Sequence, residues 1–103
     1  MSIAELPIAI DREKIAAFCR ERGILRLSLF GSVLRDDFDP VRSDVDVLIE
    51  YEPHIKLSWD IFEHARDLGL LLGRKVDMNT PGMLNRYFAD EVLRAALLVY
   101  ERG

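Results

Sequence analysis

The stretch GSVLRDDFDPVRSDVDVLIEY, residues 31–51, decides the fold expected of this 103-residue chain. It opens with a glycine–serine pair, Gly31 and Ser32, directly after the alternating apolar segment 24–30, which is typical of a β-strand. A polar loop rich in aspartate follows, and a second alternating segment ends the stretch. The pattern therefore predicts two strands joined through a glycine–serine turn and a loop.

Two carboxylates, Asp44 and Asp46, stand at the start of the second predicted strand, residues 44–51. Because successive strand side chains point to opposite faces, the two share one face, with Cα atoms about 6.6 Å apart. Aspartate is depleted in strands, so two on one face need a reason beyond solvation. Paired carboxylates suit Mg²⁺, and a glycine turn allows close approach of a phosphate. The stretch predicts a site for a metal-bound nucleoside triphosphate.

A third carboxylate, Asp77, lies in a short predicted strand at residues 75–78. Taken alone, it fits a surface position equally well. Together with Asp44 and Asp46 it would complete a site for two metal ions about 3.5–4 Å apart. Arg35, one turn after the glycine–serine pair, is the basic residue best placed to contact a phosphate.

The composition is that of one ordinary globular domain, residues 1–103, with 50% hydrophobic and 31% charged residues. The net charge of -4 and the lack of a Lys and Arg cluster argue against direct nucleic-acid binding. No membrane-length apolar stretch or signal-peptide pattern is present, so we expect no membrane association. A single cysteine, Cys19, fits a cytoplasmic location.

Periodicity along the chain predicts an α/β (α+β) domain in which helices flank a small mixed sheet. A helix is expected between Asp11, as its N-cap, and Gly23. An apolar stripe over residues 57–72 predicts a second amphipathic helix, with Ser58 as its candidate N-cap and Gly73 as its end. Residues 80–96 are expected to be mostly helical, with a candidate break near Ala89 and Asp90. A last short strand is predicted at residues 97–100.

Other chemistry-bearing residues give no further site. His54 and His64 have no metal-ligand spacing and are expected at the surface. Ser32 has no nearby His and Asp arrangement, which argues against a hydrolase triad. Four aromatic residues are expected in the core or at an interface rather than as a base-stacking platform: Trp59, Phe62, Tyr87 and Phe88.

Three features together resemble the signature of the DNA polymerase β-like nucleotidyltransferase superfamily: Gly31-Ser32, Asp44-x-Asp46, and Asp77 in the segment RKVDMNT. Over nearly the whole chain, the similarity is to the minimal nucleotidyltransferase (MNT) branch. Eleven residues separate Ser32 from Asp44, one more than is commonest in that branch. The extra residue falls in the aspartate-rich loop and should leave the strand carboxylates in place.

The resemblance implies a polymerase β-like fold and a site for two Mg²⁺ ions and ATP. Asp44, Asp46 and Asp77 would be the catalytic, metal-binding carboxylates, and the triphosphate would lie at Gly31 and Ser32. An acceptor hydroxyl would attack the α-phosphorus in line, pyrophosphate would leave, and Asp77 would take the proton.

The resemblance also implies a partner. Members of the MNT branch are often encoded beside a HEPN-domain ribonuclease toxin and act as its antitoxin, some by transferring AMP from ATP to a toxin tyrosine. The short chain leaves no segment for an acceptor pocket, so we expect the acceptor on another molecule. The nucleotide preference and the oligomeric state, including a homo-oligomer, stay open.

Three alternatives remain at this point. The chain could neutralise a HEPN toxin by binding alone. It could modify a small molecule, as aminoglycoside nucleotidyltransferases do, although those carry additional helical domains for the acceptor. It could also be a structural module without a ligand, against which the three carboxylates argue.

Overall fold

The computed structural model describes residues 2–56, 58–87 and 89–102. In this part of the chain, a single mixed sheet runs in the order β3-β2-β1-β4. Strand β1 is antiparallel to both β2 and β4, whereas β2 and β3 are parallel. The strands are β1 (Ile24–Phe30), β2 (Val45–Tyr51), β3 (Val76–Asn79) and β4 (Leu97–Glu101).

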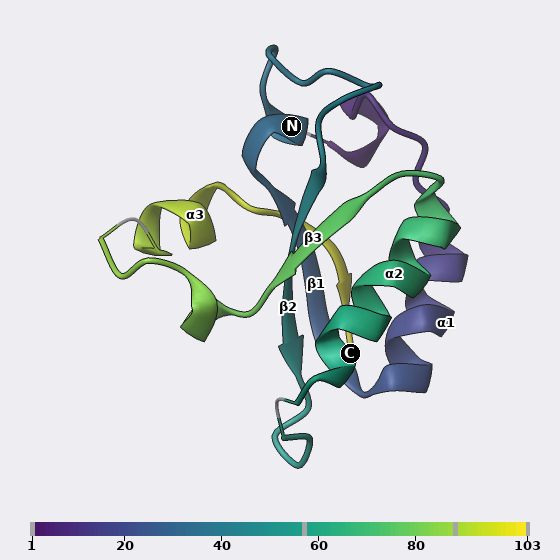
Figure 1. Cartoon of the computed structure of the whole chain (residues 1–103), viewed down its shortest axis with the longest axis vertical. Helices are drawn as coiled ribbons and strands as arrows, with labels where there is room; N and C mark the ends of the chain where they lie inside the picture. Colours follow the sequence, from purple (N-terminus) through teal and green to yellow (C-terminus); the bar gives the residue numbers. More distant parts are fainter. Residues whose placement is uncertain (1, 57, 88, 103) are drawn as a thin grey trace.

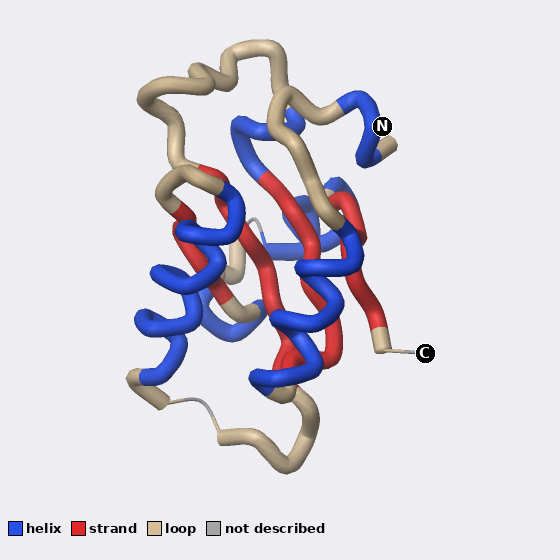
Figure 2. Tube along the Cα trace, turned by 90° about the vertical axis from the view of Figure 1, so that its right-hand side faces the viewer, coloured by secondary structure: helices blue, strands red, loops and turns tan. Residues whose placement is uncertain are grey.

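Helices flank this sheet, as the sequence predicts. Figures 1 and 2 show α1 and α2 side by side on one face, and α3 on the opposite side. Three short 3-10 turns complete the fold. The helices are α1 (Arg12–Arg22), α2 (Asp60–Leu72) and α3 (Ala89–Ala95), and the turns are η1 (Ile3–Glu5), η2 (Gly31–Leu34) and η3 (Pro81–Met83). The predicted fold class is confirmed.

Local sequence signals set the ends of α1. The Asp11 carboxylate accepts hydrogen bonds from the backbone N–H groups of Glu13 and Lys14, which would otherwise be unpaired at the helix start. At the other end, Gly23 adopts a left-handed conformation with φ 70° and donates its N–H to the carbonyl of Cys19. The predicted cap and stop are both confirmed.

The core lies between the sheet and the pair α1 and α2. Strand β2 contributes alternate residues to it, and Val45, Val47 and Ile49 are fully buried. Since neighbouring strand residues point to opposite faces, this burial turns Asp46 toward the face away from α1 and α2. The hydrophobic alternation thus fixes the direction of the carboxylate.

The segment after β3 differs from the prediction. Within residues 80–87 and 89–96, the structure has the turn η3 and the short helix α3, and residues 84–87 are not helical. In this gap, the Asn85 side chain accepts a hydrogen bond from the backbone N–H of Tyr87 at 2.9 Å. Such a local bond competes with helix formation, and Gly82 lowers the helix propensity further.

Two element starts also shift. Asp44 lies directly before β2 rather than within it. Helix α2 starts at Asp60, one residue later than the candidate cap Ser58 predicts, and Ser58 Oγ accepts a hydrogen bond from the Asp60 backbone N–H. Leu57 and Phe88, named in the sequence predictions, lie outside the described residues. No helix in the described ranges is long and apolar enough to cross a bilayer.

Candidate active site

Two of the predicted carboxylates are direct neighbours across the sheet. In the parallel ladder between β2 and β3, Asp46 is the register partner of Asp77. Register partners in a sheet point to the same face, so the two carboxylates share the face opposite α1 and α2. The prediction that Asp77 reaches the site from a neighbouring strand agrees with this register.

The third carboxylate, Asp44, lies at the entrance to β2. Its Oδ2 is 3.8 Å from Nζ of Lys75, and the backbone N–H of Val45 donates to the Lys75 carbonyl at 3.0 Å. Both side chains of this ion pair are solvent-accessible, so the pair contributes little to stability and leaves Asp44 available to a ligand.

The glycine of the glycine–serine turn lies against Asp46. Phe30, the last residue of β1, is the register partner of Asp46, and the next residue, Gly31, begins η2 with φ 75°. A Cβ on Gly31 would lie 2.2 Å from Oδ2 of Asp46. Only glycine allows the backbone to come this close to the carboxylate in this conformation.

The surroundings of Asp46 disfavour its charged form and raise its pKa. Burial raises the pKa of its carboxyl group, and the negative charges of Asp77 and Asp44 raise it further. The guanidinium of Arg35 and a hydrogen bond from the Ser32 backbone N–H act in the opposite direction on this pKa. The result is a half-buried carboxylate among like charges, an arrangement that a cation would stabilise.

A cavity of about 670 Å³ opens beside this carboxylate, within the size range of small-molecule sites. Gly31, Arg35 and Asp46 line one side of it. Helix α3 supplies the other side through Glu91, Val92 and Ala95, which the sequence analysis did not identify. Their place at the cavity depends on how α3 packs, and no local motif marks it.

Arg35 is the predicted phosphate contact. Its Nε donates to Oδ1 of Asp37 at 3.1 Å, and both side chains are exposed. An exposed ion pair of this kind is weak, so the guanidinium can exchange its partner for an anionic ligand in the cavity. The structure therefore brings Arg35 to the same cavity as Gly31 and Asp46.

The donor chemistry of the site fits Mg²⁺. Within the described residues, no three His, Cys, Asp or Glu side chains lie close enough together to hold a metal ion, so the structure does not gather Asp44, Asp46 and Asp77 into a metal cluster by themselves. Proteins usually hold Mg²⁺ through one or two carboxylates, with substrate phosphates and waters as the remaining ligands. The residues present thus suit an ion that binds together with a triphosphate.

The histidines lie elsewhere. Nδ1 of His64 is 2.7 Å from the Tyr51 hydroxyl, at the end of β2 remote from Asp46. Burial and then the charge of Arg22 lower the pKa of His64. His64 is partly exposed and His54 is exposed, in agreement with the predicted surface positions.

Fold and site together define a nucleotidyltransferase. Residues 12–99 match the nucleotidyltransferase domain family, and the chain belongs to this family. More specifically, it is 32% identical to a solved structure described as a minimal nucleotidyltransferase, with a TM-score of 0.68 and coverage of 84% of this chain and 86% of that chain. The resemblance drawn from the sequence is confirmed, and the family match supports a transferase activity.

Two more distant structures share the fold. A toxin–antitoxin complex with AMP-PNP is 18% identical, with a TM-score of 0.71 and coverage of 91% of this chain and 76% of that chain. A tri-AMPylated Shewanella oneidensis HEPN toxin in complex with an MNT antitoxin is also 18% identical, with a TM-score of 0.63 and coverage of 88% and 70%. No curated protein sequence matches this chain.

Proposed function

We propose that this chain is a Mg²⁺-dependent nucleotidyltransferase that transfers AMP from ATP to a hydroxyl of a HEPN-type toxin, with a tyrosine as the acceptor, and so acts as an antitoxin. The pairing of Asp46 with Asp77 on one sheet face, beside Gly31, carries the proposal. It supplies carboxylates from two strands next to a turn whose backbone can approach a phosphate.

Each residue has a separate part in the proposed transfer. Asp44, Asp46 and Asp77 would hold two Mg²⁺ ions, which when bound supply positive charge against the triphosphate and lower the pKa of a coordinated hydroxyl. The backbone at Gly31 and Ser32 would bind phosphate oxygens.

The acceptor oxygen forms a bond to the α-phosphorus of ATP, the bond from that phosphorus to the β-phosphate oxygen breaks, and pyrophosphate leaves. Asp77 accepts the proton of the acceptor hydroxyl. Arg35 contributes positive charge where the triphosphate enters the cavity.

The partner is inferred from the structural neighbours. One of them is an MNT antitoxin bound to an AMPylated HEPN toxin, and another toxin–antitoxin complex contains an ATP analogue. Because both share the fold of this chain, they support a HEPN protein as acceptor and ATP as donor.

Neutralisation by binding alone is the second candidate function, since the same neighbours are complexes. The electrostatics of Asp46 favour the enzyme. A half-buried carboxylate next to Asp77 and Asp44 costs stability, and a surface used only for binding has no need of it.

Metal-dependent ATP binding is the first test. ATP titrated by calorimetry should bind with Mg²⁺ and much more weakly without it. Asp44→Asn should abolish the dependence on Mg²⁺ while the fold, followed by circular dichroism, is retained. Asp36→Asn, an equal change of charge at an exposed loop position, is the control and should bind as the wild type does. ATP affinity unchanged in Asp44→Asn would refute the proposed site.

A further inference from the structure

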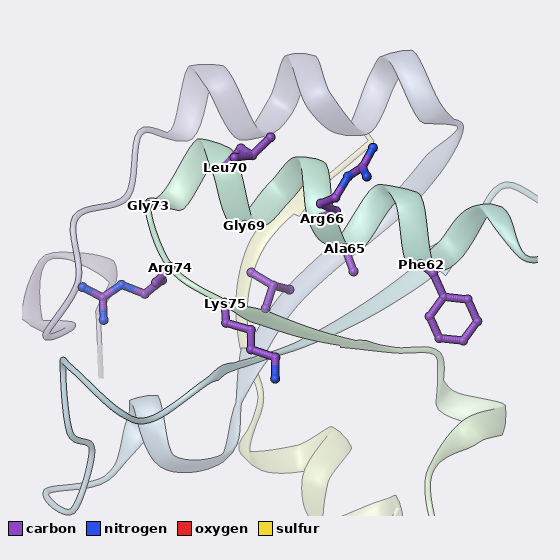
Figure 3. A pocket seen from close by; sticks show the side chains of 9 residues that line it. Phe62, Ala65, Arg66, Gly69, Leu70, Gly73, Arg74 and Lys75 are labelled. Atoms are coloured by element: carbon purple, nitrogen blue, oxygen red, sulfur yellow. The ribbon is translucent and has the colours of Figure 1, made fainter.

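A second cavity, of about 590 Å³, lies between α2 and the beginning of β3, away from Gly31 and Arg35. Figure 3 shows it with Phe62 at one end and Arg74 and Lys75 near the other. We call it the α2–β3 groove. Its apolar surface includes Phe62, Leu70 and Val76.

The groove adjoins an edge of the sheet. Among the described strands, β3 is outermost and pairs with β2 on one side. An edge strand presents backbone N–H and C=O groups that an extended segment of another chain can pair with. Because the groove and the edge of β3 adjoin each other, one extended segment can bind to both.

Large apolar side chains at the groove are exposed. Leu70 is 78% exposed and Phe62 is 63% exposed. Phe62 stacks on Trp59, which is 84% exposed, with ring centroids 5.8 Å apart. This exposure excludes the core position for these two aromatic residues, and the interface position stays a prediction. Exposed aromatic clusters of this kind mark protein interaction sites.

The charge of the groove is opposite to that of the chain. Arg66, Arg74 and Lys75 line it, in a chain with a net charge of -4. Arg74 Nη1 donates to the Pro40 carbonyl at 3.1 Å, and Lys75 Nζ lies 3.8 Å from Oδ2 of Asp44. The exposed Arg66 therefore supplies the main positive charge. A basic rim around apolar side chains is complementary to a segment in which acidic residues flank apolar ones. A second copy of this acidic chain is a less favourable occupant, because the net charges repel.

The groove lies near the candidate active site. Lys75 lines it, and the Lys75 Nζ lies 3.8 Å from Oδ2 of Asp44. Two residues further along the chain is Asp77, the register partner of Asp46. Because Asp46 and Asp77 face the side of the sheet opposite α2, a segment bound in the groove reaches them by continuing around the outer edge of β3.

We infer that the α2–β3 groove is the docking surface of the protein that carries the acceptor hydroxyl, and that it takes an acidic, partly apolar segment of that protein. The inference rests on the proposed function, which requires an acceptor from outside. Docking there would position the hydroxyl and reduce the entropic cost of the reaction.

The test compares binding with transfer, using as the probe the HEPN-domain protein that the proposed function expects as the partner. Trp59 is the single tryptophan of this chain and stacks on Phe62 at one end of the groove, so its fluorescence follows docking in the absence of ATP if the probe lacks tryptophan. Calorimetry replaces fluorescence otherwise. The groove variant is Arg66→Glu with Leu70→Glu, both at exposed helix positions. Arg12→Glu, an exposed arginine on α1, is the matched control.

We expect the groove variant to bind the HEPN protein about tenfold more weakly or worse, and the control to bind as the wild type does. Wild-type binding should weaken as salt rises. The affinity for Mg²⁺–ATP without the HEPN protein should not change, because neither residue lines the nucleotide cavity. The single variant Arg66→Ala should show a smaller loss of the same kind and guards against misfolding of the double variant.

Equal binding by wild type and groove variant would overturn the inference while leaving AMP transfer intact. The absence of any complex with the wild type would overturn it too, as would self-association of the chain that the groove variant abolishes, which would assign the groove to a second copy. If the wild type binds the HEPN protein but transfers no AMP, and the groove variant does not bind, the groove is the docking surface and the proposed function is wrong.

Discussion

Gly31 and Asp46 lie so close that a Cβ on the glycine would come within 2.2 Å of Oδ2 of the aspartate. The glycine also has φ 75°, a conformation that side chains disfavour. A glycine is therefore required at position 31 for two reasons: it allows the turn out of β1, and it leaves space for the carboxylate of Asp46. The sequence predicts Gly31 as the point where the backbone approaches a phosphate, and the structure adds this second reason for a glycine.

Gly31→Ala should lose more stability than Gly73→Ala. At Gly73 φ is 71° and no atom lies within 4 Å of an added Cβ, so alanine there costs only the left-handed conformation, about 1–2 kcal/mol. At Gly31 the clash with Asp46 adds to this cost. Urea unfolding of both variants measures the difference.

Gly31→Ala and Gly73→Ala should also differ in their effect on nucleotide binding. Because the clash displaces the Asp46 carboxylate, Gly31→Ala should lose Mg²⁺–ATP binding, whereas Gly73→Ala should keep it. Gly82→Ala, where φ is not left-handed and no atom lies within 4 Å, is the neutral control. Full ATP affinity in Gly31→Ala would show that the nucleotide does not depend on this contact.

The raised pKa of Asp46 makes stability depend on pH in a defined direction. The folded state holds the Asp46 proton more tightly than the unfolded state does, since burial and then Asp77 and Asp44 raise this pKa from 3.8. Between the two pKa values the folded state binds more protons, so this group's contribution to stability falls as pH rises.

Asp46→Asn removes this penalty. The variant should be more stable than the wild type at pH 7, by a few degrees in Tm at most, because the group is only half-buried. The gain should disappear as pH falls below the unfolded pKa, where both forms are neutral. Thermal unfolding by circular dichroism at a series of pH values checks this, and a variant less stable at pH 7 would count against the burial of an uncompensated charge.

Asp77→Asn separates catalysis from binding. If Asp77 takes the proton of the acceptor, its replacement should lower the rate of AMP transfer by about 10²–10⁴-fold and change ATP affinity little, since the interaction forms mainly in the transition state. Single-turnover kinetics with calorimetric ATP binding provide both values. Transfer at nearly the wild-type rate would show that Asp77 is a surface carboxylate without a role in the transfer, as the sequence also allowed.

The parts of the fold that local signals determine were predictable. Asp11 and Gly23 mark the ends of α1, and alternating apolar residues in β2 turn Asp46 away from the core. That Asp77 joins Asp44 and Asp46 was predicted from the chemistry of a two-metal site and from the family resemblance, whereas its register pairing with Asp46 was not predicted. What the sequence could not show depends on packing of distant segments, such as the contact of α3 with the nucleotide cavity.

Residues 84–87 show the limit of periodicity. Their sequence continues an apparently helical segment, but the local hydrogen bond of Asn85 and the poor propensity of Gly82 shorten it to η3 and α3. The exposed residues Trp59 and Phe62 show the same limit. Apolar residues at helical spacing predict burial, but the pattern does not indicate whether the core or another protein covers them.

The most direct test of the proposed function is transfer of label from α-labelled ATP to the HEPN-domain protein expected as the partner, with its RNA cleavage assayed in the same samples. We predict that the wild type with Mg²⁺ labels the HEPN protein on tyrosine and stops the cleavage. The double variant Asp44→Asn, Asp46→Asn should bind the HEPN protein without labelling or neutralising it. Neutralisation that proceeds equally well without ATP, or in the double variant, would contradict the proposed transfer and leave binding alone as the function.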